Sequence, residues 1–139
     1  ADYCSELGVN LVELKKSTLT KLEKTGQMHP AYSRRNPLDI VGDALPERYE
    51  AAINILLNEP YISGLIVIQT LQTMTNSEED SRIIIEANKQ HPDKPIICVY
   101  IGGRFSKRGR LLLESKGIPD YNDLSKAVRA MKALISRNL

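Results

Sequence analysis

The residues best suited to chemistry form a short polar stretch from Gln69 to Thr75, with the letters QTLQTMT. It offers amide and hydroxyl groups between an apolar run and the start of a predicted helix. In open α/β sheets, ligands bind outside the carboxyl ends of the parallel strands. The stretch therefore predicts a binding loop, although the sequence carries no complete catalytic apparatus.

A second candidate is the basic turn that begins at Gly102-Gly103 and continues through Arg104 to Gly109. It follows an apolar run and opens a helix, which is the context of many anion sites. Its basic residues lie where the helix dipole disfavours cations, and this favours a functional role. The alternative, a glycine-rich turn with a solvated basic helix start, is the commoner situation and stays open. The phosphate-binding motifs GxxxxGK[ST] and GxGxxG are both absent from the sequence.

The remaining reactive side chains form no recognisable catalytic or metal-binding set. His29 lies in a polar loop and His91 precedes a proline, and neither has a carboxylate or nucleophile at a meaningful spacing. Cys4 and Cys98 show no CxxC or metal-ligand spacing, so we expect free thiols. Unpaired thiols favour a reducing, cytoplasmic setting. We therefore predict no catalytic residue and no metal site in this chain.

Composition limits the classes of partner. The chain has 139 residues, which suits one domain, and a formal net charge of +2. That charge is too small to indicate a nucleic acid or an anionic membrane as partner. No apolar run approaches the roughly 20 residues that span a bilayer. The first predicted helix, which ends before Gly8, is expected to begin before residue 1, and we expect the chain to be part of something longer.

Apolar periodicity and turn residues predict the elements that position both loops. Expected strands cover residues 38–41, 64–68, 95–100 and 118–121, and helices follow them, with Asp43 and either Asn76 or Ser77 as N-caps. The runs 64–68 and 95–100 lack alternation, which is typical of strands buried on both faces. This order predicts a three-layer α/β/α domain with a parallel sheet over residues 36–139. Residues 1–35 are expected to form a truncated leading helix, a short helix and a linker.

The series that begins at Asn36, NPLDIVGDALPERYEAAINILLNEPYISGLIVIQTLQTMT, resembles the C-terminal flavodoxin-like CoA-ligase module of the nucleoside-diphosphate-forming acyl-CoA synthetases. That family includes ADP-forming acetyl-CoA synthetase and, more distantly, succinyl-CoA synthetase. The likeness continues through Gly102-Gly103, residues 114–119 (ESKGIP) and residues 127–130 (AVRA). It covers the chain from about Ser17 to its end.

The resemblance implies a reaction in which acyl-CoA, ADP and phosphate give a carboxylate, CoA and ATP through a phosphohistidine on another domain. It implies a CoA-binding Rossmann domain, a phosphohistidine domain and an ATP-grasp domain as partners. ATP or ADP, Mg and CoA are expected for the complete enzyme, and none for this domain alone. The residues that match the family's phosphohistidine docking pocket are Gln72, Thr73, Met74, Thr75, Asn76 and Ser77. A helix start suits a phosphate, since its N–H groups are free.

The sequence departs from the family pattern at two positions. Leu71 stands where many members have proline, and Leu45 stands where many have threonine. The phosphorylated histidine motif is absent, so neither His29 nor His91 takes that role. Two alternatives stay open: a nucleotide- or acyl-CoA-sensing module of a protein acetyltransferase or regulator, and a structural subunit that completes an interface.

Overall fold

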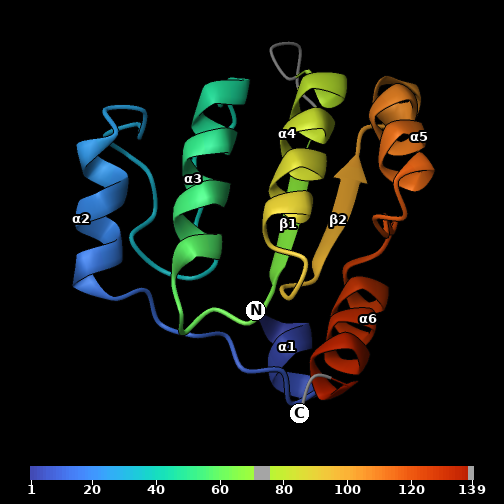
Figure 1. Cartoon of the computed structure of the whole chain (residues 1–139), viewed down its shortest axis with the longest axis horizontal. Helices are drawn as coiled ribbons and strands as arrows, with labels where there is room; N and C mark the ends of the chain where they lie inside the picture. Colours follow the sequence, from blue (N-terminus) through green and yellow to red (C-terminus); the bar gives the residue numbers. More distant parts are fainter. Residues whose placement is uncertain (71–75, 138–139) are drawn as a thin grey trace.

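The computed structural model describes residues 1–70 and 76–137, and residues 71–75 and 138–139 lie outside the description. The described helices are α1 (Asp2–Glu6), α2 (Lys16–Lys24), α3 (Pro46–Asn58), α4 (Ser77–Gln90), α5 (Lys107–Ser115) and α6 (Leu124–Arg137), with a 3-10 helix η1 (Gly103–Ser106) before α5. The strands are β1 (Leu65–Thr70) and β2 (Ile96–Ile101). In Figure 1, α3 and α4 lie on one side of the strands.

The sheet is parallel, as predicted, but the described residues form two strands where the sequence predicted four. β1 pairs with β2 in parallel, and Val67 lies opposite Cys98. The predicted strand at 118–121 is reduced to a single parallel bridge between Cys98 and Asp120. Two backbone hydrogen bonds hold that bridge, from Cys98 N to Pro119 O (2.8 Å) and from Tyr121 N to Cys98 O (2.9 Å).

The predicted strand at residues 38–41 is wrong, because this segment pairs with no strand in the described part of the chain and bonds locally. Asp39 O accepts a hydrogen bond from Ser33 N (2.8 Å), and Asp39 Oδ1 accepts one from Val41 N (2.8 Å). Val41 has a φ of 73°, a left-handed value that a β-branched residue rarely takes and that breaks an extended run. The predicted cap also fails: Leu45 is the N-cap of α3, and Asp43 pairs with Arg48 (2.6 Å) instead.

Two apolar clusters on opposite faces of the sheet confirm the three-layer arrangement. Cys98 and Tyr100 of β2 face a cluster built with α3, α4 and α5. Ile97 and Val99 of the same strand face α6, chiefly Ala127 and Met131. This alternation is what a strand between two helix layers requires, since successive side chains point to opposite faces.

The two strands differ in how well they are covered. β2 is buried on both faces over residues 96–100, as predicted. In β1 the prediction holds for one face only: Val67 and Gln69 are buried, whereas Ile68 is 42% exposed. α6 packs mainly on β2, so the outward face of β1 is left partly open.

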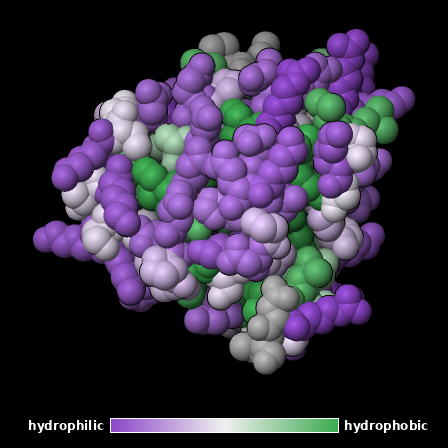
Figure 2. Space-filling model, in the orientation of Figure 1, coloured by the Kyte–Doolittle hydropathy of each residue, from purple (hydrophilic) through white to green (hydrophobic). Residues whose placement is uncertain are grey.

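The N-terminal helices pack on the rest of the domain. Leu22 of α2 is fully buried, and Lys21 forms an ion pair with Glu59 at the end of α3 (2.6 Å). The domain boundary after residue 35 stays a prediction. Figure 2, which looks onto α3 and α4, shows a mainly hydrophilic surface with hydrophobic residues between the helices. In the described part of the chain, no helix is both long and apolar enough to cross a bilayer.

Candidate functional site

The start of α4 lies just past the carboxyl end of β1, where a ligand site is expected in a parallel sheet. Asn76 is the N-cap, which confirms one of the two predicted caps, and its side-chain oxygen accepts a hydrogen bond from Glu79 N (3.1 Å). Asn76 O accepts a further bond from Asp80 N (3.0 Å). A short polar side chain thus caps the first turn of α4, as is common at the N-termini of helices.

Ser77 joins the two candidate loops. Its hydroxyl donates to Phe105 O in η1 (3.0 Å), so the turn after β2 is tied to the start of the helix after β1. Ser77 is 7% exposed. A Cβ added at Gly109 would lie 2.4 Å from Ser77 O, so α5 can approach α4 this closely only with glycine there. The structure therefore brings the predicted residues Asn76 and Ser77 close to the Gly102–Gly103 turn.

The Gly102–Gly103 turn begins η1, whereas the sequence predicted a loop followed directly by an α-helix. Gly103 has a φ of 54°, in the region that favours glycine. Gly102 O accepts from Phe105 N (3.2 Å), and Ser106 Oγ donates to Gly103 O (2.8 Å). The Phe105 side chain is left 69% exposed.

The charges around the start of α4 are mixed. Glu78 lies 3.6 Å from Arg108 at the start of α5 and 3.9 Å from Arg82. Glu79 also pairs with Arg82 (3.0 Å). Acidic residues in a first turn stabilise the helix but repel an anion. The two arginines offset that repulsion, so the end of the sheet is not a strongly negative surface.

Four of the six residues predicted for the docking pocket, Gln72, Thr73, Met74 and Thr75, lie outside the described residues. Gln69, the first residue of the predicted binding loop, is part of β1 instead and is fully buried. Thr70 is the last residue of the strand and is exposed. β1 therefore extends two residues further than the strand that the sequence predicted.

Gln69 takes part in a buried polar cluster that the sequence did not predict. Gln69 Nε2 donates to Asp80 Oδ2, and the Asp80 side chain is enclosed, with a residue exposure of 1%. Burial raises the pKa of Asp80 to about 7, although the Gln69 bond works in the opposite direction. Burial, with a further contribution from the negative charge of Asp80, raises the pKa of Tyr49 to about 12.

Two buried oxygens in this cluster, Gln69 Oε1 and Asp80 Oδ1, have no hydrogen-bond partner among the described residues. A carboxyl group and a primary amide can satisfy each other fully when the carboxyl carries its proton. A protonated Asp80 Oδ1 would donate to Gln69 Oε1 and complete a two-bond ring with the bond already present. The raised pKa and the two unpaired oxygens both favour the neutral acid. The sequence offered a weak signal: a glutamine at the end of an apolar strand, and an aspartate in a helix face that is otherwise core.

A second buried acid lies near the end of β2. The Asp120 side chain is fully enclosed, and its Oδ2 lies 2.5 Å from Arg110 Nε of α5. Its Oδ1 accepts a hydrogen bond from Tyr100 N (3.1 Å). Both oxygens are used to hold α5 against the sheet, so this pair has a structural role.

The described residues hold no group of three or more His, Cys, Asp or Glu side chains that could bind a metal ion. His29 Nδ1 accepts a hydrogen bond from Ala31 N (3.0 Å), and His91 is the C-cap of α4. Cys98 is buried, and burial raises the pKa of its thiol. These groups serve local structure and turn formation.

No family model matches the chain. Among curated proteins, it is 37% identical over its whole length to an ADP-forming acetate–CoA ligase of Methanocaldococcus jannaschii, covering 20% of that protein. It is 29% identical, over 99% of its length, to the alpha subunit of ADP-forming acetate–CoA ligase II of Pyrococcus furiosus, covering 30% of it. The chain therefore spans between a fifth and a third of these relatives.

Solved structures agree with the sequence comparison. The chain matches a dinucleotide-forming acetyl-coenzyme A synthetase of Ca. Korarchaeum cryptofilum, solved in complex with phosphate and ADP, with a TM-score of 0.87 and 25% identity. The match covers 99% of this chain and 30% of that one. A protein of Pyrococcus horikoshii matches with a TM-score of 0.88 and 28% identity, again over 99% of this chain.

Proposed function

We propose, on the premise that this chain belongs to the ADP-forming acyl-CoA ligase family, that it works as one module of a larger ligase. The complete enzyme would convert acyl-CoA, ADP and phosphate into a carboxylate, CoA and ATP. Support comes from relatives named as ADP-forming acetate–CoA ligases and from a structural neighbour solved with ADP and phosphate. The relatives are three to five times longer than this chain, which supports sister domains as partners.

Within that enzyme, residues 72–75 together with Asn76 and Ser77 would form part of the pocket that receives a phosphohistidine from another domain. The observation that carries this proposal is the anchored start of α4 at the carboxyl end of β1. A helix start offers backbone N–H groups and a favourable dipole to a phosphate. Because the Ser77 hydroxyl already donates to Phe105 O, Ser77 would contribute its N–H rather than its hydroxyl.

The partners would be a CoA-binding Rossmann domain, a phosphohistidine domain and an ATP-grasp domain. ATP or ADP, Mg and CoA would bind to those domains.

The arginines near the pocket would help to hold an anion there. Arg108 reaches Glu78 at the start of α4, and its side chain is 85% exposed. Gly102 and Gly103 would act with them as a secondary anion site.

The test is turnover of the complete enzyme with Gln72→Ala and Thr75→Ala combined. If the pocket is here, turnover should fall by about 10²-fold or more, since positioned donors to a transferring group are typically worth that much. Thermal stability should stay unchanged. Gln90→Ala, at the other end of α4 and bonded only to Glu86 among the described side chains (3.4 Å), is the matched control. Full turnover in the double variant would contradict the assignment of this pocket.

A further inference from the structure

One edge of β1 has no neighbouring strand among the described residues, where the sheet consists of β1 and β2 with one added bridge on the far side of β2. Leu65 N donates to Pro95 O (2.9 Å), so residues 65, 67 and 69 direct their backbone N–H and C=O groups toward β2. The N–H and C=O groups of Ile66, Ile68 and Thr70 therefore point away from β2. An edge of this kind is a template for another strand.

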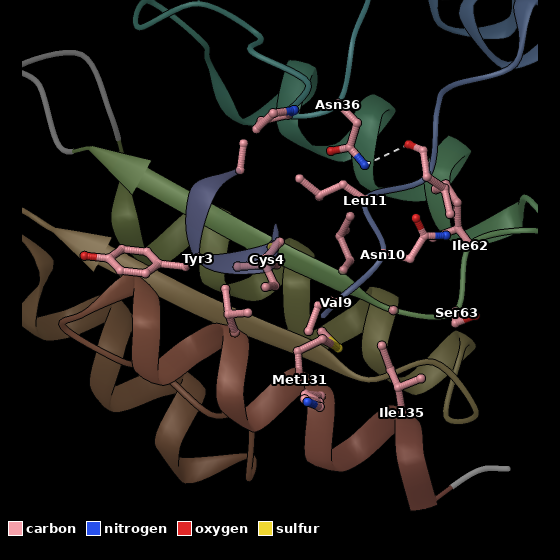
Figure 3. Close-up of a pocket in the computed structure, with 18 of the residues that line it drawn as sticks. Tyr3, Cys4, Val9, Asn10, Leu11, Asn36, Ile62, Ser63, Met131 and Ile135 are labelled. Carbon is pink, nitrogen blue, oxygen red and sulfur yellow. Dashed lines mark hydrogen bonds between the residues drawn. The ribbon is translucent and has the colours of Figure 1, made fainter. Parts of the chain in front are cut away.

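A cavity of about 480 Å³ lies along this edge. Ile66 and Ile68 line it from β1, and another wall is formed by residues 9–12, Leu14 and residues 36–38. Asn36 Nδ2 ties that wall together through a hydrogen bond to Val12 O (3.0 Å). Figure 3 shows Leu11 and Asn36 on one side of the space and Met131 and Ile135 on the other, with β1 running past it.

Apolar side chains reach the cavity from both faces of the sheet. Leu56 comes from α3, whose layer covers one face. Val128 and Met131 come from α6, which covers the other face. A strand placed in the plane of the sheet would thus find an apolar wall on each side, as strands of parallel sheets do. Several cavity residues, including Ile68 at 42% exposed, are left with incomplete cover.

We infer that this cavity is the slot for an extended apolar segment from outside residues 1–139, which adds to β1 as a parallel strand of about five residues. Its side chains would alternate between Leu56 and Val128, and its peptide groups would bond with those of Ile66 and Ile68. The inference rests on the proposed function, in which this chain is one part of a longer ligase. The strand comes from that polypeptide.

A small molecule is a poorer match to the same space. Pockets that hold small ligands combine apolar walls with a few convergent polar side chains. Polar side chains such as Asn10 and Ser63 do line this cavity, and Asn36 is already bonded to Val12 O. The backbone N–H and C=O groups of Ile66 and Ile68 have no strand partner among the described residues, and only a second backbone can satisfy them in series. The apolar walls on both faces likewise match alternating side chains rather than one compact ligand.

The first test is residue-resolved amide hydrogen exchange in the complete polypeptide. If a strand occupies the slot, the amides of Ile66 and Ile68 should exchange within about tenfold of those of Leu65 and Val67. The β2-facing amides serve as controls in the same molecule. Exchange of Ile66 and Ile68 more than about 100-fold faster than the controls would overturn the inference, because a free strand edge is not protected.

The second test identifies the occupant with a photo-crosslinking phenylalanine derivative at Leu38, again in the complete polypeptide. Cross-links should map to one apolar segment outside residues 1–139, in the same molecule. The derivative at Leu111, which is 54% exposed on α5 and does not line the cavity, should give no link to that segment. Cross-links to a second copy of residues 1–139, or only to a small molecule, would overturn the inference.

These readouts are separate from turnover. A protected β1 edge with full turnover in the Gln72→Ala and Thr75→Ala enzyme would leave the slot standing and remove the proposed pocket. An unprotected edge with lost turnover would do the reverse.

Discussion

β1 and β2 have similar apolar sequences but different surroundings. β2 is paired along β1 and bridged to Asp120, and both of its faces lie under helices. β1 has an edge that no other strand of the described residues covers, an exposed Ile68 and a buried glutamine near its carboxyl end. The difference shows that an apolar run specifies a strand, while its neighbours decide whether the strand is core or boundary. The boundary strand is also the one that leads into the proposed pocket.

The largest expected effect comes from shortening one isoleucine in each strand. Ile97→Ala in β2 should lower the free energy of unfolding by about 4 kcal/mol, because a fully buried side chain leaves a cavity. Ile68→Ala in β1 should cost less than about 1 kcal/mol, since the side chain is 42% exposed. Urea denaturation of the 139-residue protein measures both.

The same two variants test the difference between β1 and β2 again in the complete polypeptide. There, an added strand would cover Ile68 and raise the cost of Ile68→Ala, while the cost of Ile97→Ala should stay the same. Equal losses for the two variants in the 139-residue protein would contradict the view that only β2 is core on both faces.

The next effect is a pH dependence of the stability, which arises where Asp80 contacts Gln69 of β1 and has no counterpart predicted for β2. The pKa of Asp80 rises from 3.8 to about 7 on folding, so the folded state holds the proton between these values. The contribution of Asp80 to stability should therefore be full below about pH 4, fall as the pH rises toward 7, and be lost above it. The total loss from this group is on the order of 4 kcal/mol.

Asp80→Asn removes this dependence while keeping a neutral group that can donate to Gln69 Oε1. The variant should have a flatter stability profile between pH 4 and 7 and should match or exceed the original protein at pH 8. Glu86→Gln, at an exposed position further along α4 where Glu86 pairs with Lys89, should keep the original profile. Urea midpoints measured across this pH range give the answer, and an unchanged slope in Asp80→Asn would refute a buried neutral acid.

The sequence predicted the features that depend on local residues. The apolar run at 95–100 became a strand buried on both faces, and Asn76 became the N-cap of α4, since both follow from residue type and spacing. The prediction of a strand at 38–41 was wrong because Val41 adopts a left-handed backbone conformation, which the local sequence does not predict.

The location of the candidate site, at the carboxyl end of β1, stays a prediction. The buried polar cluster beside it was not predicted from the sequence. The pairing of Gln69 with Asp80 depends on the orientation of α4 against β1, which the sequence does not express. The exposure of Ile68 depends on α6 packing mainly on β2, a fact about tertiary structure rather than about the run itself.

The smallest effect concerns the contact that joins the ends of the two strands. Ser77→Ala removes the hydroxyl that donates to Phe105 O (3.0 Å) and should cost about 1 kcal/mol of stability. Ser115→Ala is the matched control, because that exposed hydroxyl bonds only within α5 among the described residues (2.7 Å to Leu112 O) and should cost less than about 0.5 kcal/mol. Because Ser77 ties the start of α4 to η1, its loss should also speed amide exchange in residues 103–106, whereas the Ser115 variant should not. Equal effects of the two variants on exchange in η1 would mean that the ends of β1 and β2 are held independently.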